Sequence, residues 1–281
     1  MDLVRVIEVR KSNGDLVPFD FQKLKVALLR SGAKKNDLDR IVEEVFFQVY
    51  DGISTKRIYQ LAYEILKKES VNAAGRYRLK KAIFDLGPSG YPFEKFVGRL
   101  FENRGYKAAV GQVIQGQCVT HEVDVVAEND NELIVVECKF HHQQGRKSDV
   151  KVALYVKSRF DDLKKQFEKE GRLGQRKFTG YIATNTRFTD DAIQYATCSG
   201  MKILAWDYPT QENLQEWIEA SNYHLVTALS SASKRIKTLL LENNIVLCRE
   251  LIQQKDRLFD LGVPQSTIPK IIKEAEAITG L

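Results

Sequence analysis

The sequence predicts an α/β protein in which a mixed β-sheet is flanked by helices, with a mostly helical segment before it and a helical segment after it. Three observations lead to this fold class. Apolar stretches of strand length alternate with helical periodicity in the middle of the chain. A hairpin signal, Asn13-Gly14, stands near the N-terminus and is followed by helical periodicity. From about Pro209 onward the pattern is helical throughout.

The N-terminal segment is expected to form a β-hairpin followed by four helices. The stretch from Val4 to Val9 partly alternates, and Leu16–Phe19 follows the turn as the second strand. Ser54 is a suitable N-cap for the third helix, and Gly87 ends the fourth. We expect the first domain to span residues 1–88. Its helices are predicted at Phe21–Arg30, Leu38–Val49, Ile58–Lys68 and Gly75–Leu86.

The middle segment alternates strands and helices. Pro92 is a favourable residue for the first turn of a helix, and Gly105 closes that helix. The order of elements then predicts a mixed sheet with helices on both faces, spanning residues 91–208. Strands are expected at Tyr106–Ile114, His121–Ala127, Leu133–Phe140, Gly180–Thr184 and Lys202–Trp206, and helices at Asp149–Lys169 and after Thr189.

The C-terminal segment, residues 209–281, is predicted to be a helical domain. Leu258–Pro264 and Ser266–Ile278 indicate two short helices around a glycine turn. This arrangement resembles a helix–hairpin–helix, whose backbone amides contact DNA phosphates without discriminating between bases. A generic helical turn explains the pattern nearly as well.

Composition limits the classes of protein to which this chain can belong. No apolar stretch of about eighteen residues is present, and no secretory leader precedes the first strand, so we expect a cytoplasmic protein without a membrane span. The four cysteines lie far apart, which argues against a zinc knuckle or a disulfide framework. A net charge of +6 favours an anionic partner.

Acidic residues interrupt two neighbouring apolar strands. Asp124 lies within the strand His121–Ala127, and the next strand ends in Glu137-Cys138-Lys139. Residues two apart on a strand share a face, so Glu137 and Lys139 point together and Cys138 points away. If the two strands pair as a hairpin, Asp124 lies beside Glu137.

Carboxylates in apolar strands are costly to bury unless a cation neutralises them. Two carboxylates and a strand carbonyl would form an incomplete oxygen cage of the kind that magnesium tolerates. Lys139 could position or deprotonate a water, or stabilise charge on a phosphate. The alternative is a surface ion pair at a sheet edge. His141 and His142 follow directly and are expected to be exposed, with a phosphate contact as the alternative.

The middle segment resembles the PD-(D/E)xK nuclease superfamily, specifically its Mrr-like restriction endonuclease branch. The likeness rests on the helix Pro92–Phe101, on Asp124, on Glu137-Cys138-Lys139 and on the later strand–helix–strand from Ile182 to Leu204. The resemblance implies a restriction-endonuclease-like domain in which Asp124, Glu137 and the Cys138 carbonyl bind Mg²⁺ or Mn²⁺. It also implies that Lys139 serves the attacking water and that Glu94 assists through a second metal or a water.

The N-terminal segment resembles the ATP-cone, a regulatory nucleotide-binding domain. The matching features are the hairpin from Val9 to Gly14, the strand Val17–Asp20, Lys23 on the first helix and the closing Arg76–Lys81. By this resemblance Val9, Lys11 and Lys23 contact ATP or dATP. Turn amides, a helix N-terminus and nearby lysines together suit a phosphate group. The alternative is a retained fold used only for association.

Together these features predict a Mg²⁺-dependent DNA endonuclease, a hydrolase, that carries a regulatory ATP- or dATP-binding domain. The expected partners are DNA, an adenine nucleotide and further copies of the chain in a homo-oligomer. The alternative hypothesis is a nucleotide-responsive DNA-binding regulator with an inactive nuclease fold. RNA cleavage also stays open, because the phosphate chemistry is shared.

Overall fold

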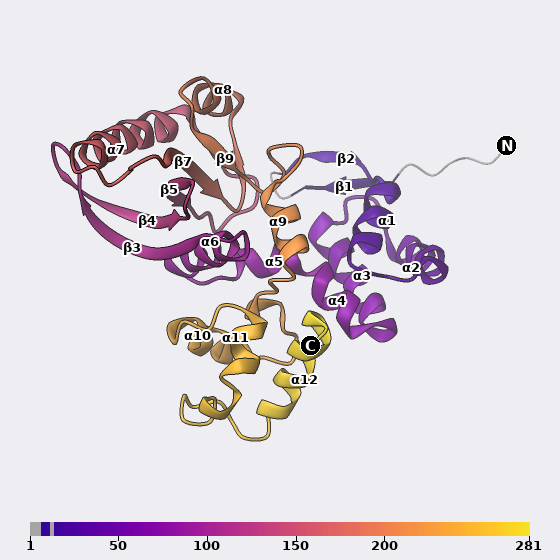
Figure 1. The fold of residues 1–281 in the computed structure, drawn as a ribbon. Helices are drawn as coiled ribbons and strands as arrows, with labels where there is room; N and C mark the ends of the chain where they lie inside the picture. Colours follow the sequence, from indigo (N-terminus) through magenta and orange to yellow (C-terminus); the bar gives the residue numbers. More distant parts are fainter. Residues whose placement is uncertain (1–6, 12–13) are drawn as a thin grey trace. The chain divides into compact units, whose positions relative to one another are not determined.

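The computed structural model describes residues 7–11 and 14–281, and the chain divides into two units (Figure 1). One unit joins Met1–Ala82 with His224–Leu281, and the other is Ile83–Tyr223. The predicted mixed α/β class is confirmed. In the described part of the chain no helix is both long and apolar enough to cross a membrane.

A five-stranded sheet with the order β3-β4-β5-β7-β9 forms the centre of the second unit. β3, β4 and β5 are an antiparallel meander, and β7 and β9 are added in parallel, so the sheet is mixed as predicted. A short parallel pair, β6 (Lys147–Ser148) and β8 (Arg187–Phe188), was not foreseen in the sequence. The sheet strands are β3 (Lys107–Gln115), β4 (Thr120–Glu128), β5 (Glu132–Lys139), β7 (Lys177–Thr184) and β9 (Lys202–Leu204).

Helices cover both faces of this sheet (Figure 1). On one face, α6 (Tyr91–Asn103) approaches β3 so closely that a Cβ on Gly98 would lie 2.9 Å from Val110 Cγ2. On the other face lie α7 (Val150–Lys169) and α8 (Asp190–Cys198), whose apolar side chains form a buried cluster with those of the strands. The side chains of Asp149 and Thr189 cap the two helices, and the helix after Thr189 was predicted from the sequence.

Helix α9 (Leu214–Ser221) belongs to the same unit as the sheet. The Trp217 ring lies 5.3 Å from the ring of Phe101 on α6, edge to face. The Arg104 guanidinium lies 3.8 Å from the centre of the Trp217 ring, a cation–π geometry. The helix that follows the last strand therefore packs onto α6.

The N-terminal part of the first unit is a hairpin followed by helices. β1 (Glu8–Arg10) pairs antiparallel with β2 (Leu16–Pro18). The predicted strand start at Val4–Val6 and the turn residue Asn13 lie outside the described residues. In place of the single helix expected at Gly75–Leu86 there are two helices, and the first of them begins earlier, at Val71. They are separate because the backbone leaves helical geometry at Arg78. The helices are α1 (Phe21–Arg30), α2 (Lys35–Gln48), α3 (Thr55–Glu69), α4 (Val71–Tyr77) and α5 (Leu79–Phe84).

The C-terminal segment is helical, and it packs against the N-terminal part of the same unit. A Cβ on Gly75 of α4 would lie 2.5 Å from Ile278 Cδ1, so only glycine permits this approach. The Thr227 hydroxyl donates to the Ala82 carbonyl at 2.6 Å. The predicted helix near Leu258 is a turn after a 3₁₀ segment. The elements are η1 (Val226–Ala228), α10 (Lys234–Glu242), α11 (Cys248–Gln253), η2 (Lys255–Arg257) and α12 (Ile268–Thr279).

His224 stands where these two segments of the first unit meet. Its side chain is buried, and its carbonyl accepts the N–H of Cys248 at 2.7 Å. Burial first, and the Arg76 guanidinium second, lower the pKa of His224 to about 4. The folded protein therefore binds fewer protons here than the unfolded chain, whose histidine pKa is about 6.5.

We predict that acid destabilises the first unit through His224. Stability rises with pH where the unfolded state binds more protons, so the contribution is lost as pH falls from about 6.5 toward about 4. Between pH 7 and pH 4.5 the loss is about 2 kcal/mol. Urea unfolding at both pH values should show a smaller loss for His224→Gln, and exposed His142→Gln is the matched control. Equal acid sensitivity of wild type and His224→Gln would contradict this assignment.

Candidate active site

The predicted acidic residues lie where β4 and β5 separate. The antiparallel ladder between these strands ends at Val125 opposite Val136, and one step further in the same register are Asp124 and Glu137. There the backbone N–H of Cys138 donates to Asp124 Oδ2 at 2.6 Å. The carboxylate of Asp124 thus accepts the hydrogen bond that a strand carbonyl would otherwise take. The structure therefore brings Asp124 to the base of Glu137-Cys138-Lys139.

Glu137 and Lys139 project from the same side of β5 and touch each other. Lys139 Nζ lies 2.5 Å from Glu137 Oε1. The next strand fixes this part of β5, since Glu137 is in register with Ile182 and the Thr184 hydroxyl donates to the Lys139 carbonyl at 2.7 Å. The Glu137 side chain is 6% exposed, so its charge is held inside the protein. A buried carboxylate requires such a partner.

Arg159 of α7 is a second cationic partner of Glu137, and the sequence analysis did not single it out. Its Nη1 lies 2.6 Å from Glu137 Oε2, and its Nη2 donates to the Glu122 carbonyl. The signal was present in the sequence, because Arg159 stands among the buried residues Val156, Phe160 and Leu163 on the apolar face of the helix. A charge on that face needs a partner in the sheet.

Glu94 joins the acids from α6, where it lies in the first turn. Burial first, and then the carboxylates of Asp124, Glu122 and Glu137, raise the pKa of Glu94 to about 7. Burial and then the Glu137 carboxylate raise the pKa of Asp124 to about 6. These acids therefore repel one another, and Lys139 offsets part of that repulsion at both Glu94 and Asp124.

The donor chemistry of these residues fits a hard divalent cation. Asp124, Glu137 and Glu94 offer carboxylate oxygens, which Mg²⁺ and Mn²⁺ prefer. Burial and then neighbouring carboxylates raise the pKa values of Asp124 and Glu94, and a cation would offset both effects. Within residues 7–11 and 14–281, however, no three His, Cys, Asp or Glu side chains stand ready as a metal site. Both oxygens of Glu137 already accept from cationic side chains.

Asn185 fixes the chain where it leaves β5. Its Oδ1 accepts the His141 N–H and its Nδ2 donates to the His141 carbonyl, both at 2.8 Å, and the side chain is fully buried. His141 is half-buried, with Nε2 3.0 Å from Ser148 Oγ, so the expected exposure holds only for His142. The exposed residues 142–147, which include Arg146, thus start from a fixed point near Lys139.

Asp162 of α7 is a further polar residue that the sequence analysis did not identify. It accepts the backbone N–H of Cys118 at 2.9 Å and lies 2.8 Å from His121 Nε2. These bonds, with the His121 contact first, lower the pKa of Asp162 to about 2. A Cβ on Gly116 would collide with the same carboxylate. Asp162 therefore ties the β3–β4 turn to α7.

The residues expected to bind nucleotide surround the hairpin of the first unit. The Val9 side chain is buried opposite Val17, so only its backbone is available to a ligand. Lys11 is exposed at the end of β1, and its N–H donates to the Asp15 carbonyl at 2.8 Å. Lys23 is exposed in the first turn of α1, 3.4 Å from Asp20 Oδ2. Ser12 and Asn13 of the turn lie outside the described residues.

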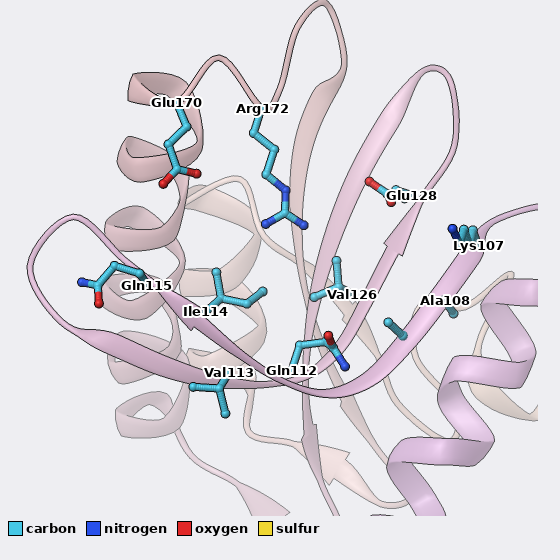
Figure 2. A pocket seen from close by; sticks show the side chains of 11 residues that line it. Lys107, Ala108, Gln112, Val113, Ile114, Gln115, Val126, Glu128, Glu170 and Arg172 are labelled. Carbon is cyan, nitrogen blue, oxygen red and sulfur yellow. The ribbon is translucent and has the colours of Figure 1, made fainter.

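A hollow of about 500 Å³ lies elsewhere on the second unit, between β3, β4 and the end of α7 (Figure 2). Lys107, Gln112, Glu128 and Arg172 are among its lining residues. Glu128 is already paired with Arg176 at 2.8 Å. The hollow is not lined by any residue of the candidate site, namely Glu94, Asp124, Glu137 and Lys139.

Comparison with family models divides the chain into three matches. Residues 7–83 match the ATP cone domain, residues 88–218 match a restriction endonuclease domain, and residues 226–279 match the domain described as AF1548-like, C-terminal. The first two matches confirm both resemblances inferred from the sequence.

Two relatives extend over most of the chain. An uncharacterized protein of Archaeoglobus fulgidus is 33% identical over 186 residues, which is 66% of this chain and 100% of that protein. The crystal structure of AF1548, a protein of unknown function, is 32% identical with a TM-score of 0.57, covering 68% of this chain and 99% of that one. Can2 from Sulfobacillus thermosulfidooxidans, solved with cyclic tetra-adenylate, is 17% identical with a TM-score of 0.33, covering 70% and 55%. That likeness is too low to bear on fold or function.

We predict that Asn185→Asp loosens the chain after β5. The substitution places a carboxylate oxygen against the His141 carbonyl and removes one donor, so stability should fall by about 1–3 kcal/mol. Hydrogen exchange in residues 141–147 should accelerate, while Asn131→Asp, at an exposed turn, should leave it unchanged. Unaltered exchange in Asn185→Asp would show that the two hydrogen bonds do not hold this segment.

Proposed function

This chain belongs to the AF1548-like family and combines a restriction endonuclease domain with an ATP cone, and on that premise we propose that it is a nucleotide-regulated, divalent-metal-dependent DNA endonuclease. Asp124, beside Glu137 and Lys139 where β4 and β5 separate, is the observation that carries this proposal. The arrangement supports hydrolysis of a phosphodiester bond.

Each residue has a defined role in the proposed reaction. Asp124 and Glu137, with the Cys138 carbonyl, would hold Mg²⁺ or Mn²⁺, and Glu94 would assist through a further metal or a water. Such a metal would supply Lewis-acid stabilisation of the phosphate and a more acidic water. Lys139 orients or deprotonates the attacking water and stabilises negative charge on the phosphate. Uncatalysed phosphodiester hydrolysis is slow enough to need all these contributions.

The ATP cone is the regulatory part of the proposal. The hairpin, Lys11 and Lys23 bind the phosphates of ATP or dATP, because exposed lysines favour anions. Nucleotide binding then changes DNA cleavage in a homo-oligomer through a shared conformational equilibrium. Regulation of this kind requires that each ligand alter the affinity for the other.

One observation favours a second candidate function. Both oxygens of Glu137 accept from cationic side chains, as they would in a nuclease fold that binds DNA without cutting it. In that case the protein would be a nucleotide-responsive DNA-binding regulator.

We predict that the purified protein cleaves DNA with Mg²⁺ or Mn²⁺ and that Lys139→Ala lowers the rate roughly a hundredfold or more, because a positioned proton-transfer group is lost. Supercoiled, linear and branched DNA should be incubated with each metal, with and without ATP or dATP, beside an RNA substrate. Lys177→Ala, an exposed lysine on β7, is the matched control and should cleave like wild type.

The same assay separates the two candidate functions. DNA binding without cleavage, unchanged by Lys139→Ala, would favour the regulator. Cleavage of RNA alone would correct the substrate class.

We predict that Lys11→Ala weakens ATP and dATP binding about tenfold or more, because a charge-assisted hydrogen bond to phosphate is worth about 1.5–3 kcal/mol. Isothermal titration calorimetry measures the affinity directly. Lys56→Ala, an exposed lysine on α3, is the control and should bind like wild type. An equal affinity for Lys11→Ala would remove this lysine from the proposed nucleotide site.

A further inference from the structure

Two cationic side chains contact the single negative charge of Glu137. Lys139 Nζ contacts one carboxylate oxygen at 2.5 Å and Arg159 Nη1 contacts the other at 2.6 Å. The Arg159 side chain is 14% exposed and the Glu137 side chain 6%, so water screens this pair only weakly. The carboxylate is thus neutralised before any metal arrives.

The two cationic partners of Glu137 differ in how they are held. Lys139 lies two residues along the same strand, and its side chain is 33% exposed. Arg159 comes from α7 and has a second acceptor of its own, the Glu122 carbonyl. It can therefore release the carboxylate and still keep one hydrogen bond.

We propose that Arg159 is a resident counter-cation that competes with the divalent metal for Glu137 and thereby sets the metal affinity of the site. The inference rests on the proposed function, since it concerns the same carboxylate. A divalent ion on Glu137 would be a third cation on a carboxylate that already has two, and Arg159 would repel it at short range. Metal binding then requires Arg159 to give up its hydrogen bond to Glu137 Oε2.

If Arg159 instead oriented Glu137 as a metal ligand, its removal would change the metal affinity in the opposite direction. An arginine that merely orients a metal ligand strengthens the site, and its removal weakens metal binding by 10–100-fold. A competitor weakens the site, and its removal tightens metal binding. The direction of the change therefore decides between a competing and an orienting arginine.

The test measures Mn²⁺ binding to the full chain by titration calorimetry without DNA. Arg159→Gln should bind Mn²⁺ roughly tenfold more tightly than wild type, and Arg159→Lys, which keeps the charge, should stay close to wild type. Unchanged or weaker binding by Arg159→Gln, with wild type binding normally, would overturn the competition while leaving the proposed nuclease function intact. No Mn²⁺ uptake by any of the three proteins would instead remove the metal site and the proposed function with it.

A second measurement needs no metal. In metal-free protein, Arg159→Gln should lower the melting temperature, because it leaves Glu137 with one cation fewer. In a Glu137→Gln background the same substitution should have a much smaller effect, as a double-mutant cycle for a direct pair requires. Additive effects of the two substitutions would show that Arg159 does not neutralise Glu137. Arg159→Met, which removes the charge but keeps an unbranched apolar side chain, takes the place of Arg159→Gln in both measurements if Arg159→Gln fails to fold.

Discussion

Neutralisation of the buried Glu137 carboxylate is the interaction on which the arrangement of the second unit depends. The free-energy cost of removing a carboxylate from water is several kcal/mol unless cations and hydrogen bonds replace the water. Lys139 and Arg159 supply that replacement from β5 and from α7. The charge therefore links the sheet to the helix that covers it, and the rest of the candidate site is arranged around this link.

The surrounding acids complete the electrostatic picture. Asp124 and Glu94 lie in the same cluster, and their pKa values are raised to about 6 and about 7 by burial and by neighbouring carboxylates. Two cationic side chains thus contact Glu137, while the carboxyl groups of Asp124 and Glu94 repel it and each other. A hard divalent cation would reduce the repulsion between these carboxyl groups. The donor set therefore fits Mg²⁺ or Mn²⁺, although no three ligands stand ready among the described residues.

The first unit combines the ATP cone with the C-terminal helices. Gly75 lets α4 and α12 approach, and Thr227 donates to the Ala82 carbonyl, so these segments share one packed interior although they lie far apart in the sequence. The ATP cone match ends at residue 83 and the AF1548-like match begins at residue 226.

The sequence by itself determined the order of strands and helices, the mixed sheet and the juxtaposition of Glu137 and Lys139, because periodicity, caps and strand alternation are local. The pair of β6 with β8 and the position of His141 against Asn185 followed from contacts distant in sequence. Only the tertiary structure decided that Arg159 reaches Glu137 and that Asp162 ties the β3–β4 turn to α7. Those pairings depend on how α7 lies across the sheet, and no spacing along the chain encodes that geometry.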